Sequence, residues 1–323
     1  MTGAIIGDIV GSRFEFNPTN DYNFEFLSKE CSFTDDTICT IAVADALLKG
    51  KDFGESIHEW CRKYPNPMGG YGISFHKWVL SDTPKPYNSF GNGAAMRVSP
   101  VAYWYKDEDE MLDAAAATAL PTHNHDEGIK GAQTVALAIF KAMQFNRRHY
   151  QEAAMHIDDI IKTCVDFSGY DINMPKSSVL NRFDETCQGT VPVALKIISM
   201  ATCYEDAVRL AVSLGADADT LGAIVGSIAE AIWGMPSEYR WLEDWLPDDM
   251  MNVVVRFDMK LRGISKTLID TTFAGTSFSE SAWDLLYDTE GKEEVERLKT
   301  MVGKEKEEKR RLMAERGKAR LAW

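Results

Sequence analysis

The chain alternates between long apolar stretches and short polar ones rich in Gly, Asn, Asp and Pro. In residues 128–146 apolar side chains recur three and four positions apart, which places them on one face of a helix. The stretches 38–48 and 221–232 are apolar at nearly every position, which indicates buried helices. No stretch alternates convincingly with the two-residue period of a strand. The pattern predicts a compact all-α, multi-helix fold, with further helices at 51–66, 151–166, 190–203 and 204–213.

Glycine is spaced for close helix packing at two places in the chain. Glycines at 3, 7 and 11 recur every four residues, so a helix there would carry them on one face. Gly222 and Gly226 give a second predicted helix a surface that a neighbouring backbone can approach. Glu15 stands where the first of these helices should end, before Asn17-Pro18. From these residues alone, Glu15 is interpreted as a solvated charge.

Acidic residues and threonines gather at the predicted start of two apolar helices. The first cluster is Thr34-Asp35-Asp36, and the second is Asp217-Ala218-Asp219-Thr220. Capping a helix needs one such side chain, not three. Charges at a buried helix end need compensation, and a hard divalent cation bound by several oxygens supplies it. The two clusters are therefore predicted as half-sites of one metal centre, with a solvated acidic turn as the alternative.

Two further stretches are candidates for substrate binding. Residues 87–97 are rich in Gly and Asn, so their exposed backbone N–H groups, ahead of a helix predicted to start at Ala94, can cradle a phosphate. Ordinary turns have the same composition. His123 and His125 precede the 128–146 helix, where zinc binding is one alternative. Because no cysteine or third histidine lies nearby in the sequence, a hydrogen-bonding role is favoured.

Composition narrows the class of protein. The chain has 323 residues and a net charge of −14, which argues against binding to the phosphate backbone of a nucleic acid. No apolar run approaches the roughly 20 residues that span a bilayer, and no signal peptide is recognised at the N-terminus. Six scattered cysteines indicate reduced thiols and a cytoplasmic protein. Residues 292–320 mix charges at helical spacing, which predicts a solvated helix or a coiled-coil arm, with a partner contact as the alternative.

The motifs, taken in order, resemble those of the ADP-ribosylglycohydrolases, a group that includes the dinitrogenase-reductase-activating glycohydrolase and the ADP-ribosyl-acceptor hydrolases. The resemblance covers roughly residues 1–258, and its motifs are specific as a set although each alone is not. They read as follows: Gly7-Asp8, Gly11-Ser12-Arg13-Phe14-Glu15, Phe33-Thr34-Asp35-Asp36-Thr37, Gly91-Asn92-Gly93-Ala94-Ala95-Met96-Arg97, Thr122-His123, and Gly215-Ala216-Asp217-Ala218-Asp219-Thr220 followed by Gly222-Ala223-Ile224.

The resemblance implies an all-α fold, two Mg²⁺ or Mn²⁺ ions, and hydrolysis of the bond between ADP-ribose and an acceptor, most simply a modified protein side chain. By position, Glu15 would be the catalytic glutamate and His123 a substrate contact. The implied pyrophosphate loop is Ser89, Phe90, Gly91 and Asn92, with the aromatic ring beside the nucleotide. The implied metal ligands are Thr34, Asp35, Asp36, Asp217, Asp219 and Thr220. Ala216 and Ala218 replace residues common in the family, but no ligand is lost.

Residues 1–258 are accordingly predicted to be the catalytic domain, and 259–323 a C-terminal extension ending in a charged helix. The predicted partner is an ADP-ribosylated protein or small molecule; no membrane is expected, and nucleic acid only as a modified substrate. Two alternatives stay open, a non-catalytic ADP-ribose binder and a two-metal phosphohydrolase. The acceptor, the choice between Mg²⁺ and Mn²⁺, the proton-transfer role of Glu15 and the oligomeric state are left undecided by the sequence.

Overall fold

The computed structural model describes residues 1–146, 152–235 and 242–262. Residue contacts divide the chain into two units, Met1–Leu246 and Pro247–Trp323. In the second unit the described helix is α13, Asp248–Leu261. The charged helix predicted at 292–320 and most of the predicted extension lie outside the described residues, so the boundary at 258 stays a prediction.

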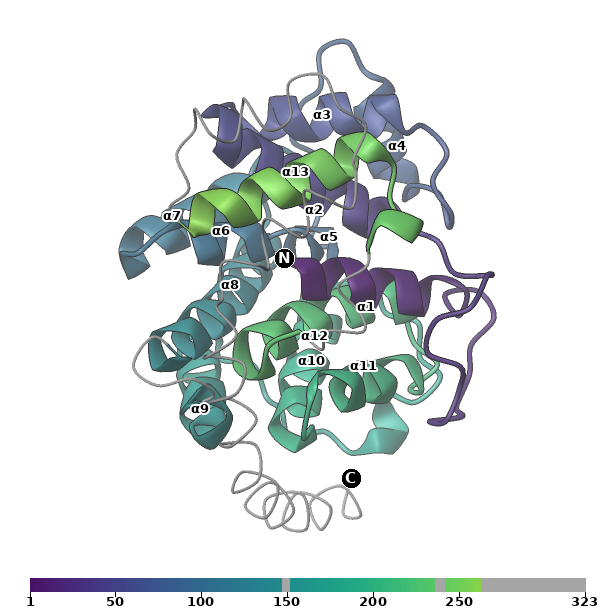
Figure 1. The fold of residues 1–323 in the computed structure, drawn as a ribbon, viewed down its shortest axis with the longest axis vertical. Coiled ribbons are helices and arrows are strands. Elements are labelled where there is room, and N and C mark those ends of the chain that lie inside the picture. Colours follow the sequence, from purple (N-terminus) through teal and green to yellow (C-terminus); the bar gives the residue numbers. More distant parts are fainter. Residues whose placement is uncertain (147–151, 236–241, 263–323) are drawn as a thin grey trace, which may run out of the picture. The chain divides into compact units, whose positions relative to one another are not determined.

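The first unit is built of helices joined by short loops (Figure 1). Its α-helices are α1 (Thr2–Ser12), α2 (Asp35–Lys49), α3 (Phe53–Lys63), α4 (Ile73–Leu80), α5 (Gly93–Met96), α6 (Ser99–Trp104), α7 (Glu108–Ala119), α8 (Asp126–Asn146), α9 (Ile157–Ser168), α10 (Cys187–Met200), α11 (Tyr204–Val212) and α12 (Ala218–Trp233). Short 3₁₀ helices are η1 (Glu152–Met155), η2 (Lys176–Ser178) and η4 (Leu242–Asp244).

The described residues contain no strand, only an isolated antiparallel bridge between Gly91 and Thr186. The predicted all-α fold is therefore confirmed. Three helices begin and end elsewhere than predicted. Helix α3 is shorter than 51–66 at both ends, and α9 starts several residues later than 151. Helix α10 starts before 190 because Thr186 caps it: the Thr186 hydroxyl accepts from the N–H of Gly189 at 3.0 Å. None of the helices in the described parts of the chain is long and apolar enough to cross a membrane.

The centre of the first unit is the contact between α1 and α12, which lie against each other in Figure 1. The predicted glycine faces meet there: a Cβ at Gly7 would overlap the backbone of Gly222, and one at Gly3 the carbonyl of Gly226. Because neither helix has a side chain at these points, their backbones touch. This contact brings the carboxyl half of α1 next to the first turn of α12.

The third helix at the centre is α2, almost all of which is buried. Thr34 begins it as predicted: its hydroxyl accepts from the N–H of Asp36 at 3.2 Å. Gly50 ends it with φ 64°, a left-handed conformation that favours glycine. The first turn of α2 therefore faces α1 and α12 with its acidic residues, while α3 packs along its outer side.

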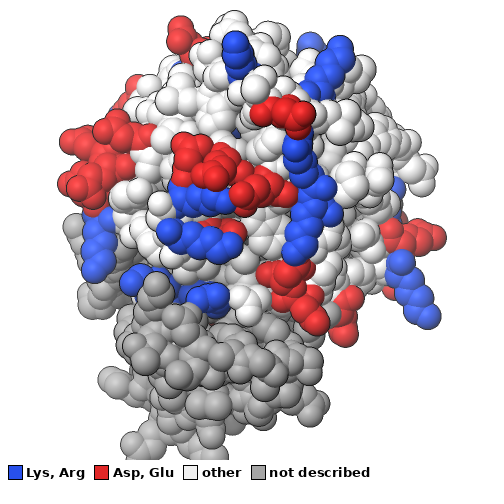
Figure 2. Space-filling view, turned by 90° about the horizontal axis from the view of Figure 1, so that it is seen from above, with Lys and Arg blue, Asp and Glu red and all other residues white. Residues whose placement is uncertain are grey.

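On the face drawn in Figure 2, Lys and Arg side chains lie next to Asp and Glu side chains. Several ion pairs among the described residues join residues four positions apart on one helix, such as Lys162 with Asp166 and Arg209 with Glu205. Exposed pairs of this kind each add only about 0.3–0.5 kcal/mol. The charged groups that differ from this pattern are buried aspartates, among them Asp8, Asp36 and Asp219.

Candidate metal and substrate site

Asp8 is buried in the middle of α1 and joins that helix to the start of α2. Its Oδ1 accepts from the hydroxyl of Thr34 at 2.8 Å, and its Oδ2 accepts from the N–H groups of Thr34 at 3.0 Å and Thr37 at 3.1 Å. The Thr37 hydroxyl donates to the same Oδ2. Burial raises the pKa of Asp8 to about 6, although these donors act in the opposite direction. Asp8 therefore holds the first turn of α2 in place.

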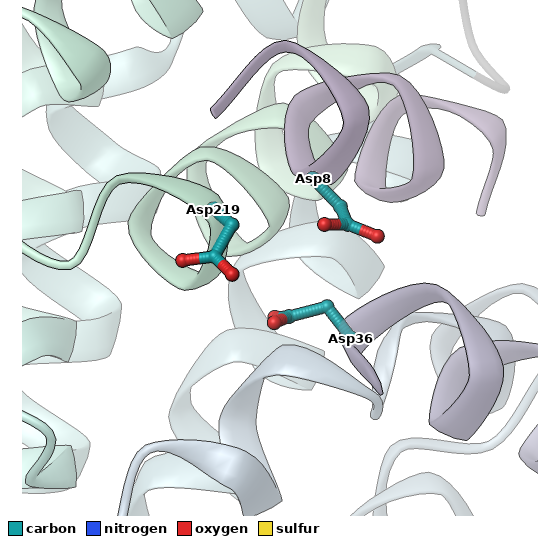
Figure 3. A group of neighbouring side chains, drawn as sticks. All are labelled: Asp8, Asp36 and Asp219. Carbon is teal, nitrogen blue, oxygen red and sulfur yellow. The ribbon is translucent and has the colours of Figure 1, made fainter. Parts of the chain in front are cut away.

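Asp36 and Asp219 meet Asp8 from two other helices. Figure 3 shows the three carboxylates extending from α1, α2 and α12 toward a common space. One oxygen from each lies within 4.8 Å of the others. The Thr220 hydroxyl donates to Asp36 Oδ2 at 3.1 Å, which links the first turns of α2 and α12. The structure thus brings the two sequence clusters together.

Glu15, Asp217 and Asp219 form a second group of carboxylates, with oxygens again within 4.8 Å of one another. Asp217 stands at the N-cap of α12 but makes no capping bond; its Oδ2 instead accepts from Asn92 Nδ2 at 2.7 Å. Glu15 lies beyond the end of α1, half-buried. Gly69, with φ 76°, packs its backbone directly against the Glu15 carboxylate. A single carboxylate, Asp219, belongs to both groups.

Burial and mutual repulsion raise the pKa values of these acids. Burial, followed by the charge of Asp219, raises the pKa of Glu15 to about 8. Burial raises the pKa of Asp217 to about 7, and it holds the pKa values of Asp36 and Asp219 well above their usual range. Each deprotonated member therefore makes ionisation of the others more costly.

Asp35 stands apart from both groups. It is the first residue of α2 and half-buried, and it is not among the carboxylates that converge within 4.8 Å. Burial, then the neighbouring Cys39 and the charges of Asp219, Asp8 and Glu15, raise its pKa well above the usual range. Asp35 is thus within electrostatic reach of the cluster but at its edge.

The chemistry of the cluster fits a divalent cation. None of the ion pairs among the described residues includes Asp8, Glu15 or any of the four aspartates 35, 36, 217 and 219. Three buried oxygens lack a hydrogen-bond partner: Asp36 Oδ1, Asp219 Oδ1 and Glu15 Oε2. Buried, unpaired carboxylates are strongly disfavoured, and Mg²⁺ and similar ions prefer oxygen ligands of this kind. These acidic groups can therefore hold a metal ion.

The predicted pyrophosphate loop, residues 89–92, contacts Asp217 through the side chain of Asn92. Its backbone is partly engaged already: the N–H of Gly91 donates to Ser89 Oγ at 3.1 Å, and that of Asn92 donates to the carbonyl of Glu185 at 2.7 Å. Asn92 is buried, with its side chain on Asp217. Phe90 is 45% exposed and lies with its ring centre 5.3 Å from that of His125. Of the four loop residues, Phe90 presents the most side-chain surface to a ligand.

His123 is buried and fixed by a chain of hydrogen bonds. Arg97, fully buried, donates to Thr122 Oγ1 at 2.8 Å, and this oxygen lies 2.7 Å from His123 Nδ1. Burial and the charge of Arg97 hold the pKa of His123 well below its usual range, so the ring is neutral. This arrangement favours the tautomer protonated on Nε2. A Cβ at Gly91 or Gly93 would lie 3.3 or 3.2 Å from that Nε2, so the glycines leave the ring open to the loop.

Sequence reasoning missed three parts of this site. Asp8 belongs to a predicted motif but not to the predicted metal ligands. The sequence does carry a signal for it, because Asp8 is an acidic residue within a predicted helix of apolar residues and glycines. Arg97 orients His123 through Thr122, and only the fold shows this. Glu185 supplies a carbonyl to Asn92, and its charge raises the pKa values of Glu15 and Asp217. No motif marks Glu185 in the sequence.

Comparison with known proteins gives consistent results. The family model described as ADP-ribosylglycohydrolase matches residues 1–269. The chain is 25% identical to human ADP-ribosylhydrolase ARH3 over 306 residues, covering 73% of this chain and 84% of the relative. It is 24% identical to the ADP-ribosylarginine hydrolase Tri1 of Pseudomonas putida (strain GB-1) over 271 residues, covering 75% and 72%. It is also 26% identical to the Escherichia coli (strain K12) protein YegU over 248 residues, covering 63% and 72%.

Among solved structures, one described as an ADP-ribosylglycohydrolase-related protein complex matches with a TM-score of 0.62 and 22% identity, over 81% of this chain and 95% of that one. That likeness concerns the fold. The family model covers most of the chain, including both acidic clusters, the 89–92 loop and His123. The chain belongs to the ADP-ribosylglycohydrolase family.

Proposed function

We propose that this protein is a hydrolase that cleaves the glycosidic bond between ADP-ribose and an acceptor group, most simply a modified protein side chain. The observation that carries the proposal is the pair of carboxylate groups that share Asp219, one with Asp8 and Asp36 and the other with Glu15 and Asp217, in which buried oxygens lack hydrogen-bond partners. A non-catalytic binder of ADP-ribose has no need for this set of mutually repelling acids. Family membership points to the same chemistry.

The proposed metal ligands are Thr34, Asp35, Asp36, Asp217, Asp219 and Thr220, which lie at the starts of α2 and α12. Asp8 accepts several hydrogen bonds from the protein, so its role is to position the first turn of α2. Divalent cations bound here would neutralise the cluster, hold ribose hydroxyls and polarise a water molecule. The proposal takes two ions, Mg²⁺ or Mn²⁺, because the ligands come in two sets.

Glu15 is proposed as the group that moves a proton. Its Oε2 is buried without a hydrogen-bond partner and belongs to the same group as Asp217 and Asp219. Departure of the acceptor leaves positive charge on the ribose ring and a basic atom that needs a proton. Glu15 would exchange a proton with that atom or with the attacking water, and its carboxylate would stabilise positive charge on the ring.

The nucleotide is proposed to bind against the 89–92 loop and His123. His123 would donate from Nε2 toward the pyrophosphate, and the exposed ring of Phe90 would stack on the base or ribose. Arg97 and Thr122 keep the donor of His123 in orientation before the substrate arrives. Such prior positioning lets binding energy far from the reacting bond contribute to the rate.

The experiment is incubation of the purified protein with peptides of one sequence ADP-ribosylated on arginine or on serine, with Mg²⁺, with Mn²⁺ or with EDTA. Release of intact ADP-ribose that stops in EDTA, followed by mass spectrometry, is the expected result. Release of AMP would instead identify a phosphohydrolase. Tight binding of ADP-ribose without any turnover would identify a binding protein, and either outcome would overturn the proposal.

A further inference from the structure

The 89–92 loop contains one residue whose side chain contacts the acidic cluster. Asn92 is 6% exposed, and its Nδ2 lies 2.7 Å from Asp217 Oδ2 and 3.2 Å from Thr190 Oγ1. The Thr190 hydroxyl donates to the carbonyl of Asp184 at 2.9 Å, so its oxygen acts as an acceptor toward Asn92. Both neighbours of this end of the amide are therefore acceptors, which identifies it as the NH₂ group and Asp217 as its charged partner.

The N–H donors of Asn92 are all used within the protein. Its backbone N–H donates to the carbonyl of Glu185 at 2.7 Å. Its Nδ2 carries two hydrogens, for which Asp217 and Thr190 are the acceptors. A pyrophosphate is bound through donors, so Asn92 could contact one only by giving up a bond already made. Membership of the 89–92 loop is therefore not enough to make Asn92 a nucleotide contact.

Asp217 is held in a position that its own helix does not explain. It is the N-cap residue of α12, where an aspartate commonly accepts from a first-turn N–H, but its side chain makes no capping bond. The carboxylate is bonded to Asn92 instead, and one of its oxygens lies within 4.8 Å of oxygens of Glu15 and Asp219. The bond to Asn92 therefore takes the place of the cap and keeps the carboxylate beside the other two.

Asn92 belongs to a loop whose backbone is fixed on both sides. Before it, the carbonyl of Phe90 accepts from the N–H of Cys187 at 2.9 Å. After it, the carbonyl of Asn92 accepts from the N–H of Met96, in α5, at 3.0 Å. Because this backbone is already ordered, the amide loses little further conformational freedom when it holds a ligand in one orientation.

We infer that Asn92 is a positioning residue of the metal centre, which orients the Asp217 carboxylate for a cation, and not a contact of the pyrophosphate. The inference rests on the proposed function, because Asp217 is a metal ligand only in that proposal. Hydrogen bonds from surrounding residues orient carboxylate ligands, and their loss typically weakens metal binding about 10- to 100-fold.

Comparison with Asp8 supports this role. Four donors, the N–H and hydroxyl groups of Thr34 and Thr37, occupy the Asp8 carboxylate. Asp217 Oδ2 accepts from the amide of Asn92 at 2.7 Å, the length of a charge-assisted hydrogen bond. A carboxylate offers about four lone-pair sites, so Asp8 is saturated by the protein while Asp217 is held by Asn92 and can still bind a cation.

The test is a titration of the metal-free, full-length protein with Mn²⁺, measured by calorimetry and by the electron paramagnetic resonance signal of the free ion. Asn92→Ala is expected to weaken Mn²⁺ binding about 10- to 100-fold while the protein still melts cooperatively. Asn92→Ser removes the same amide, and its hydroxyl is too short to reach Asp217. It should lower the affinity in the same direction, and it provides the test if the alanine variant does not fold.

Thr190→Val is the matched control, because it removes the other acceptor of the same amide and leaves Asp217 untouched. Its Mn²⁺ affinity should stay close to that of the wild type, even if its melting temperature falls. ADP-ribose is then titrated at saturating Mn²⁺. Asn92→Ala should bind it nearly as well as the wild type, whereas a lost pyrophosphate contact would cost about tenfold at any cation concentration.

Three results would overturn the inference: unchanged Mn²⁺ affinity in both Asn92 variants, an equal loss in Thr190→Val, or a loss of ADP-ribose affinity that saturating Mn²⁺ does not restore. An equal loss in the control would mean that Asn92 only holds the loop against α10. The expected Mn²⁺ result in a protein that releases no ADP-ribose from any peptide would support the positioning role and refute the proposed function alone.

Discussion

The acidic cluster and the group formed by Arg97, Thr122 and His123 are both buried and polar. They differ in how their polar atoms are compensated. In the second group the cation Arg97 donates to a neutral hydroxyl, and the hydroxyl fixes a neutral imidazole. In the first, carboxylates from α1, α2 and α12 face one another with oxygens left unpaired. The first region leaves negative charge that a bound cation could compensate, whereas the polar groups of the second are paired within the protein.

The largest effect is expected from Asp219, the member that both carboxylate groups share. Asp219→Asn keeps the shape but removes a ligand charge, so calorimetry should show loss of cation binding and turnover should fall below detection. The metal-free variant should melt at a higher temperature than the metal-free wild type, because repulsion is relieved. Asp109→Asn, on the exposed first turn of α7, is the control. Normal turnover in Asp219→Asn would remove the basis for a metal centre here.

Glu15→Gln tests the chemistry of the same region without removing a proposed ligand. Turnover of an ADP-ribosylated peptide should fall about 10²–10⁴-fold, the usual cost of losing an acid or base. ADP-ribose affinity should change little, as titration calorimetry can show. Near-normal turnover would mean that Glu15 is a bystander, and joint loss of turnover and binding would make it structural or a metal ligand.

His123→Phe tests the second region. The substitution keeps a ring of similar size but removes the Nε2 donor, so ADP-ribose affinity should fall about tenfold, as for a lost hydrogen bond to a charged group. Cation binding should not change, because His123 is not among the clustered ligands. If cation affinity fell together with nucleotide affinity, the two regions would have to be treated as one unit.

The smallest effect is a change in the pH dependence of stability. The folded-state pKa values of about 6 for Asp8, 7 for Asp217 and 8 for Glu15 lie above the ordinary 3.8 to 4.5. Raised acid pKa values favour the protonated fold, so their stabilisation is complete below about pH 4 and is lost as the pH rises through 6 to 8.

In EDTA the melting temperature should therefore fall by a few degrees between pH 5 and pH 8. With saturating Mg²⁺ it should not fall over this range, because the cation binds the deprotonated carboxylates. Scanning calorimetry at constant ionic strength provides the measurement. Parallel curves with and without Mg²⁺ would show that the carboxylates are not linked to a cation.

The sequence predicted what depends on local signals. Thr34 caps α2, and the glycine spacings in α1 and α12 indicated a close helix contact, because each of these features follows from a few neighbouring residues. Both acidic clusters were recognised for the same reason. Their roles as metal ligands remain predictions, although the structure brings Asp36 and Asp219 together.

What the sequence did not indicate depends on contacts between distant segments. Asp8 is 28 positions from Asp36, and nothing local shows that it bonds to the backbone of α2 rather than to a cation. The amides of Gly91 and Asn92 looked free in a glycine-rich loop, but they already donate to Ser89 and Glu185. Such partners become visible only when the chain is folded.

The glycine contact between α1 and α12 has a consequence for how this site can be altered by evolution or in the laboratory. Gly7 precedes Asp8, and Gly222 lies one turn after Asp219, so the separation of these two acids is set by peptide groups in contact rather than by adjustable side chains. Substitutions of core side chains would therefore change the stability of the protein but leave the distance between Asp8 and Asp219 unchanged. A single added methyl group at Gly7 or Gly222 would push the two helices apart and increase that distance.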